Sequence, residues 1–149
     1  MTPVGIRPAG DMMGQAAAIF EEYRVHYGQT PDPEGTRRWL TEQLGIGRLA
    51  MSVAVRGEHA CGLITSTVMP ASLRLGTFWF VRDLFVTPDQ RRTGTARALL
   101  ERVIADARAA GAIRVSLQTE PENEPALALY TAAGFRPVEG LMSLALTLS

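Results

Sequence analysis

The chain has 149 residues, a length that suits one domain, and its 15 basic and 15 acidic side chains give a formal net charge of zero. This balance excludes a global field that would favour nucleic acid or an anionic membrane, so any anion site must be local. The single cysteine, Cys61, excludes an internal disulfide and a cysteine-rich metal centre.

The amino-terminal residues show neither a basic leader nor a sustained apolar core, and no later segment approaches about 18 uninterrupted apolar residues. We therefore expect a cytoplasmic protein whose single domain spans residues 1–149. His26 and His59 are isolated and lack a third ligand at metal spacing, so no metal site is expected. Cys61 lies in an apolar run and is predicted to be a small buried hydrophobe.

The first half of the chain predicts one strand, two helices and a hairpin. Asp11 can cap a helix in which apolar residues recur at helical spacing, and a second apolar stripe follows the turn segment TPDPEG. Gly57-Glu58-His59 separates two strand-like segments and favours a hairpin. In chain order we expect a strand at 4–7, helices at 11–27 and 34–44, strands at 48–56 and 60–69, and a loop at 70–76.

The most informative stretch runs from Phe78 to Gly111. Residues 78–86, FWFVRDLFV, are dense in aromatic and β-branched types and end just before Pro88, as expected of a strand. From residue 96 onward, apolar residues fall on one helical face until Gly111 ends the run. The linker Arg91 to Ala96 carries two arginines and small residues. Unpaired amides of a first helical turn and the helix dipole favour an anion, so this linker is predicted to bind a phosphate group.

Two motifs, one in this stretch and one after it, resemble those of a known family. Arg91-x-x-Gly94-x-Ala96 resembles the acetyl-coenzyme A signature Q/R-x-x-G-x-G/A of the GCN5-related N-acetyltransferases. Asn123-x-x-Ala126-x-x-x-Tyr130-x-x-x-Gly134-Phe135 is similar to the same family's N-x-x-A-x-x-x-Y-x-x-x-G-F block and lies at the expected distance. Two motifs in this order, spanning about 78–135, argue against a chance match.

The remaining elements complete the fold that this resemblance implies. After the long helix, the pattern predicts a strand at 113–119, a helix at 125–133 ended by Gly134, and a terminal strand at 141–148. The order β-α-α-β-β-β-α-β-α-β implies an α/β fold of the mixed α+β kind, with about six to seven strands in a central mixed sheet and about four flanking helices. The strand, helix and strand between 78 and 119 should form a right-handed parallel crossover, with ligand beyond the carboxyl ends of the strands.

The resemblance implies acetyl-coenzyme A as co-substrate and assigns most of the residues that bind it. Backbone amides from Arg92 to Ala96 would hold the diphosphate, and a bulged central strand would diverge from 115–119 to admit the pantetheine arm. The Leu84 amide would polarise the thioester carbonyl, and Tyr130 would protonate the departing thiolate. The implied coenzyme-binding residues are Leu84, Phe85, Val86, Arg91, Arg92, Thr93, Gly94, Thr95, Ala96, Asn123 and Tyr130.

The general base is less well defined by the sequence. Relatives that acetylate histone tails or polyamines carry a glutamate on the central strand at positions matching Phe80 or Arg82, and this chain has neither carboxylate. Asp83 is the nearest acid, although strict alternation would turn it to the opposite face unless a bulge reverses it. A water chain, or Glu21 or Glu22, is the alternative. If Arg82 faces the cleft, its guanidinium suits a carboxylate on the acceptor, whereas the alternative is a salt bridge to a neighbouring acid.

Together these residues imply an N-acetyltransferase that acts directly on the primary amine of a small molecule, such as an amino acid, without metal or a covalent enzyme intermediate. Two alternatives stay open: acetylation of a protein or peptide amine, and a non-catalytic module that binds coenzyme A and regulates a partner. Relatives often form homodimers, and neither nucleic acid nor membrane is an expected partner. Trp39 and Trp79 are expected in the core, although a Trp or Tyr of the first two helices could line the acceptor pocket.

Overall fold

The computed structural model describes residues 2–149, which form two compact units. The first unit ends at Gln118 and contains the whole sheet together with α1, α2 and α3. The second unit, Thr119–Ser149, contains the short helix α4. Within residues 2–149, no helix is long and apolar enough to cross a bilayer.

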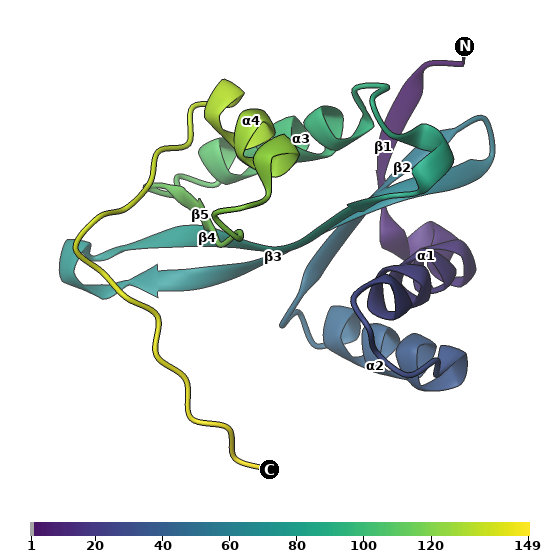
Figure 1. Cartoon of the computed structure of the whole chain (residues 1–149), viewed down its shortest axis with the longest axis horizontal. Helices are drawn as coiled ribbons and strands as arrows, with labels where there is room; N and C mark the ends of the chain where they lie inside the picture. Colours follow the sequence, from purple (N-terminus) through teal and green to yellow (C-terminus); the bar gives the residue numbers. More distant parts are fainter. Residues whose placement is uncertain (1) are drawn as a thin grey trace. The chain divides into compact units, whose positions relative to one another are not determined.

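One five-stranded sheet forms the centre of the first unit, with its strands in the order β1-β2-β3-β4-β5 (Figure 1). The first four strands are antiparallel neighbours, whereas β5 runs parallel to β4. Helix α3 connects these last two strands, so the predicted mixed sheet with a parallel crossover is confirmed. The strands are β1 (Val4–Pro8), β2 (Ala50–Arg56), β3 (His59–Ala71), β4 (Gly76–Val86) and β5 (Val115–Leu117).

Helices cover both faces of this sheet, with α1 (Met13–His26) and α2 (Pro33–Gly45) on one face and α3 (Thr95–Ala109) on the other (Figure 1). The predicted cap at Asp11 is wrong, because Asp11 lies inside a 3₁₀ turn, η1 (Ala9–Met12), and no side chain caps α1. Helix α2 does begin with a cap: the Asp32 carboxylate accepts a 3.0 Å hydrogen bond from the Gly35 amide. Phe20, Leu40, Val53, Leu63 and Phe85 belong to the core that α1 and α2 close.

Strand lengths differ from the prediction on either side of β4. The expected loop at 70–76 narrows to a 3₁₀ turn, η2 (Ser72–Arg74), and Leu75, because the hairpin pairing continues to Ala71 and Gly76. Conversely, β5 covers only Val115–Leu117 of the predicted 113–119. The strand ends where its pairing with β4 ends, so its length is set by its partner and not by its own composition.

A β-bulge in β4 determines which side chains face α1. Thr65 pairs with Asp83, whereas the next residue, Ser66, pairs with Val81, so Arg82 is an extra residue in β4. The bulge that the resemblance implies is therefore confirmed. Beyond it the alternation of β4 is displaced by one residue, which puts Asp83 and Phe85 on the face that α1 covers.

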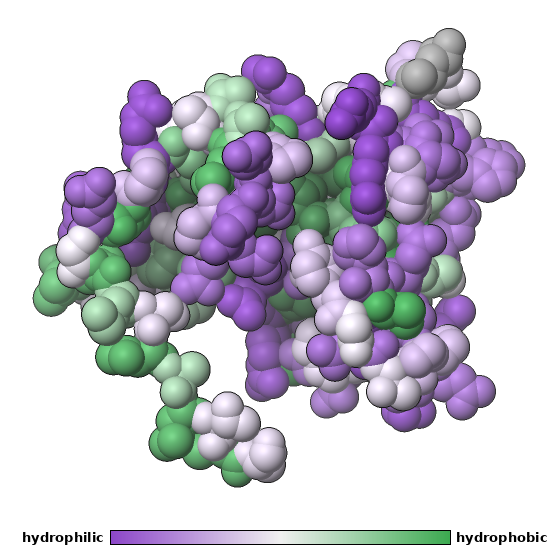
Figure 2. All heavy atoms as spheres, viewed as in Figure 1, coloured by the Kyte–Doolittle hydropathy of each residue, from purple (hydrophilic) through white to green (hydrophobic). Residues whose placement is uncertain are grey.

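The second unit consists of α4 (Glu124–Ala132) followed by a long segment without helix or strand. The predicted terminal strand at 141–148 is wrong, and the sheet consequently has five strands, not six to seven. Alternating apolar residues favour a strand only when a second backbone pairs with it, and no such pairing forms in the described chain. Apolar side chains of this segment remain exposed (Figure 2). Leu144 is 86% exposed and Leu148 is 88% exposed.

Candidate active site

The amino terminus of α3 presents backbone amides that no side chain caps. Its N-cap residue is Gly94, whose positive φ of 82° is a conformation that glycine adopts without strain. Asp32 and Asn123 cap α2 and α4, but α3 has no side-chain cap. The first-turn amides of this 15-residue helix can therefore donate to an anion, where the helix dipole also favours negative charge.

The loop that joins β4 to α3 is held in shape by its own side chains. Arg91 Nε donates a 3.0 Å hydrogen bond to the Val86 carbonyl, and its guanidinium lies 5.6 Å from the centre of the Phe85 ring. The Thr93 hydroxyl donates to the Gln90 carbonyl at 2.6 Å and lies 2.8 Å from the hydroxyl of Thr95. Arg91 thus anchors the loop to β4, while Arg92, with φ 61°, turns the chain toward α3.

Arg56 on β2 supports the same loop, and sequence reasoning missed it. Its Nη2 atom donates to the Thr95 hydroxyl at 3.2 Å and to the Thr93 carbonyl at 3.4 Å. Nη1 donates to the Thr2 carbonyl, whereas the buried Nε atom has no hydrogen-bond partner within residues 2–149. The contact joins residues 39 apart in sequence, so no local pattern could have revealed it.

Strands β4 and β5 part next to this loop. They pair only from Trp79 to Val81, so residues 83–86 of β4 lie beyond the paired segment. The Thr87 amide donates to the Cys61 carbonyl on β3 at 2.9 Å. Because amides alternate along a strand, the amide of Leu84 points to the opposite edge, where β5 has already left the sheet. The implied divergence is confirmed, and it opens an edge that an extended ligand could pair with.

Asp83 lies at this opening, held by two hydroxyl groups. Tyr23 on α1 donates a 2.7 Å hydrogen bond to Asp83 Oδ1, and the Thr65 hydroxyl donates to Oδ2. Burial, together with the Asp83 hydrogen bond, raises the pKa of Tyr23 well above its ordinary value, so Tyr23 remains a donor. Sequence reasoning did not identify Tyr23, because the contact joins residues 60 apart in the sequence.

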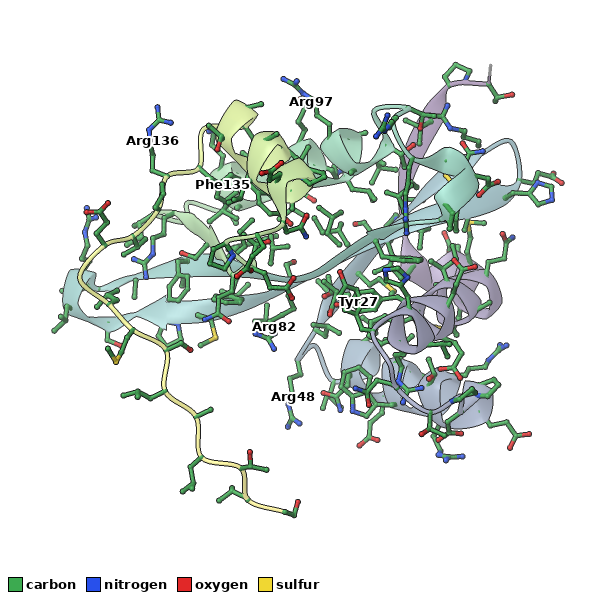
Figure 3. The ribbon with its side chains drawn as sticks, viewed as in Figure 1. Tyr27, Arg48, Arg82, Arg97, Phe135 and Arg136 are labelled. Atoms are coloured by element: carbon green, nitrogen blue, oxygen red, sulfur yellow. The ribbon has the colours of Figure 1, made fainter. Side chains whose placement is uncertain are left out.

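Arg82, the extra residue of the bulge, is exposed and lies over the Phe80 ring at 5.4 Å. It forms no ion pair with any acid in residues 2–149, so the alternative of a neighbouring salt bridge is wrong. Figure 3 shows Arg82 projecting from β4 on the side of the sheet where Tyr27 and Arg48 lie. Its charge acts on Tyr23, lowering the pKa against the larger effects that raise it.

The two candidate residues of the second unit lie on the same short helix. Asn123 Oδ1 accepts a 3.3 Å hydrogen bond from the Ala126 amide and so caps α4, which leaves the side-chain nitrogen as a donor. Tyr130 is half-buried, and its ring packs edge-on against Phe135 with centroids 5.9 Å apart. The other candidate residues belong to the first unit.

No cluster of three or more His, Cys, Asp or Glu side chains in residues 2–149 could hold a metal ion. What the first unit offers chemically is a row of backbone donors at α3, a strand edge beyond Val81 and one carboxylate fixed by two hydroxyls. Such a set can bind a phosphorylated, extended ligand and exchange a proton beside it.

Comparisons with known proteins agree with these features. A model of the acetyltransferase (GNAT) family matches residues 16–135. A probable acetyltransferase of Haemophilus influenzae is 32% identical over 85 residues, which cover 56% of this chain and 58% of that relative. The uncharacterized N-acetyltransferase YhfO of Bacillus subtilis is 28% identical over 126 residues, 85% of each chain. The crystal structure of a probable acetyltransferase has a TM-score of 0.89 and 26% identity, covering 99% of this chain and 98% of that one.

Proposed function

Because the chain belongs to the GNAT family of acetyltransferases, we propose that it moves an acetyl group from acetyl-coenzyme A directly to the primary amine of a small molecule. Members of this family are N-acetyltransferases, and acetyl-coenzyme A is the donor that they use. The observation that carries the proposal is the uncapped start of α3 beside the point where β4 and β5 part. A cytoplasmic location, a single domain and a homodimeric state stay predictions.

The residues present in the first unit fit the coenzyme. Amides from Arg92 to Ala96 would hold the diphosphate, with the exposed Arg92 side chain adding positive charge. The pantetheine arm would pair with the β4 edge along Leu84, Phe85 and Val86, and the Leu84 amide would donate to the thioester carbonyl as charge develops on its oxygen. Arg91 would contribute indirectly, since its side chain is bound to β4.

Two proton transfers remain for side chains. Asp83 is our candidate for the base that takes a proton from the acceptor ammonium, because the bulge turns its carboxylate to the α1 side and Tyr23 and Thr65 fix its orientation. Tyr130 is our candidate for the acid that protonates the departing thiolate, and Asn123 would hydrogen-bond the coenzyme through its side-chain nitrogen. No metal and no covalent enzyme intermediate are needed for this sequence of steps.

Arg82 favours an acceptor that carries a carboxylate. Its planar guanidinium is exposed and forms no ion pair within the described residues. Arg82 also immediately precedes Asp83 in the sequence. A carboxylate at Arg82 and an amino group at Asp83 would orient an amino acid with its amine toward the base. Amino acids are therefore the first acceptors to test.

The test is a thiol-release assay with acetyl-coenzyme A over amino acids, polyamines, aminoglycosides and peptides, with each acetylated product identified by mass spectrometry. We expect transfer to at least one small amine. Asp83→Asn should lower kcat more than about tenfold while acetyl-coenzyme A still binds, whereas Asp106→Asn, on the exposed face of α3, should leave kcat unchanged. Thermal stabilisation by acetyl-coenzyme A without transfer to any amine would instead identify a non-catalytic binding module.

A further inference from the structure

An aromatic groove lies along α1 and α2 in the first unit, and the steps above use only Tyr23 among its lining residues. Its volume is about 720 Å³, within the range of sites that hold small organic ligands. Four aromatic side chains line it: Phe20, Tyr23, Tyr27 and Trp39. The expectation that Trp39 belongs to the core is wrong, because Trp39 is 48% exposed.

These rings form a continuous row. Trp39 and Phe20 have centroids 6.2 Å apart, Phe20 and Tyr23 are at 5.4 Å, and Tyr23 and Tyr27 are at 5.3 Å. Phe20 is buried, but Tyr27 is 57% exposed at one end of the row and Trp39 is half-exposed at the other. Two large aromatic surfaces thus remain accessible inside a concave site, where a planar ligand could stack on them.

The row leads to the candidate base. Tyr23 both lines the groove and donates its hydroxyl hydrogen to Asp83. We propose that the groove binds the planar ring of the acceptor, so that the substrate is a primary amine joined by a short chain to an aromatic ring, with its amino group directed to Asp83. This inference rests on the proposed function and narrows its acceptor class.

The charges of the groove fit such a ligand better than a polycation. Arg24 and Arg38 balance Asp32 and Glu42 among the lining residues, so the groove has no acidic excess. Arg24 is bound to Glu21 at 2.6 Å, and the Asp32 carboxylate caps α2, so neither is an unused charge. An aminoglycoside with several ammonium groups would find few counter-charges here, whereas an aromatic amine needs only one.

The experiment compares matched acceptors at saturating acetyl-coenzyme A. We expect kcat/KM for 2-phenylethylamine to exceed that for 2-cyclohexylethylamine by about tenfold, because the two amines differ mainly in the planarity of the ring. L-phenylalanine tests whether Arg82 adds a carboxylate contact, and kanamycin represents a polycationic acceptor. Calorimetric titration of 2-phenylethylamine into the protein saturated with coenzyme A measures binding without turnover.

Variants identify the groove as the origin of the preference. Tyr27→Ala and Trp39→Ala should each raise KM for 2-phenylethylamine about fivefold and weaken its calorimetric binding. Tyr27→Phe and Trp39→Phe retain an aromatic ring, so KM and the calorimetric affinity should both stay near the wild-type values. Val25→Ala is the matched control, since Val25 is exposed on α1 and does not line the groove.

Two results would overturn the inference. One is equal kcat/KM for the planar and saturated amines, and the other is an unchanged KM in both alanine variants. In either case, transfer to some amine would still support the proposed function, so the two failures are distinguishable. If the wild-type protein transfers no acetyl group to any of the amines tested, the proposed function itself is contradicted.

Discussion

The Tyr23 hydroxyl on α1 donates a 2.7 Å hydrogen bond to Asp83 on β4, which links the helical layer to the bulged strand across 60 residues of sequence. Tyr23→Phe removes this donor and keeps the ring. We expect it to lower the free energy of unfolding by about 1 kcal/mol, because the bond to a carboxylate is only partly buried. It should also lower kcat/KM several-fold, as Asp83 loses one of its two orienting hydroxyls. Chemical denaturation and initial rates check both effects.

The stability effect should depend on pH in a defined direction. Burial, reinforced by the Asp83 hydrogen bond, raises the pKa of Tyr23 above its ordinary value of 10.0. Below that value the hydroxyl is neutral in both the folded and the unfolded chain, and its contribution to the free energy of unfolding is complete. At higher pH the unfolded chain loses the proton first, so the contribution falls as the pH approaches the raised value. The difference in stability between wild type and Tyr23→Phe should shrink above about pH 10, and a constant difference up to about pH 11 would contradict this assignment.

Gly94 is needed for its backbone conformation and not for space. Its φ is 82°, and a Cβ atom there would meet nothing within 4 Å. Gly94→Ala should therefore strain the loop by about 1 kcal/mol and displace the first-turn amides of α3. We expect KM for acetyl-coenzyme A to rise about five- to tenfold with little change in kcat. Gly45→Ala is the control, because Gly45 also has open space but no positive φ, and an equal effect there would refute the explanation.

Much of this site follows from local sequence, and the rest does not. The strand, loop and helix from 78 to 109 were predictable because their signals lie within a few residues of each other. The contacts of Tyr23 with Asp83 and of Arg56 with Thr95 join distant elements, and the first also needs a one-residue register shift that composition does not encode. The strand predicted at 141–148 was wrong for the opposite reason: its alternation of apolar residues is clear, but a strand requires a second backbone to pair with.

Arg56 should act on the coenzyme through the loop that it supports. Arg56→Met removes the hydrogen bonds to Thr93 and Thr95 and the positive charge below the start of α3. We expect KM for acetyl-coenzyme A to rise about fivefold, with kcat nearly unchanged, because the first-turn amides lose their support but the acceptor side is intact. Arg56→Lys should recover part of the loss. Arg7→Met, on the neighbouring β1, is the control, and an equal rise in KM there would contradict a specific role.

Cys61 should be inert in the folded protein. The residue is only 5% exposed, as predicted, and burial raises the pKa of its thiol. Because the thiolate is the reactive species, an aromatic disulfide reagent at neutral pH should modify Cys61 slowly in the native state and rapidly in denaturant. Rapid modification of the native chain would contradict this, and it would also distort thiol-release assays. Cys61→Ala serves as the blank for both measurements.

Tyr130 provides the sharpest test of the proposed chemistry. A phenol can protonate the departing thiolate only through its hydroxyl, so Tyr130→Phe should lower kcat more than tenfold while leaving the affinity for acetyl-coenzyme A unchanged. The ring contact with Phe135 is kept in this variant, so α4 and its packing should survive. Phe135→Leu is the matched control, because it disturbs the same contact without removing a hydroxyl. If Tyr130→Phe transfers acetyl groups at the wild-type rate at every pH, another group must donate the proton, and a purely structural role for Tyr130 would follow.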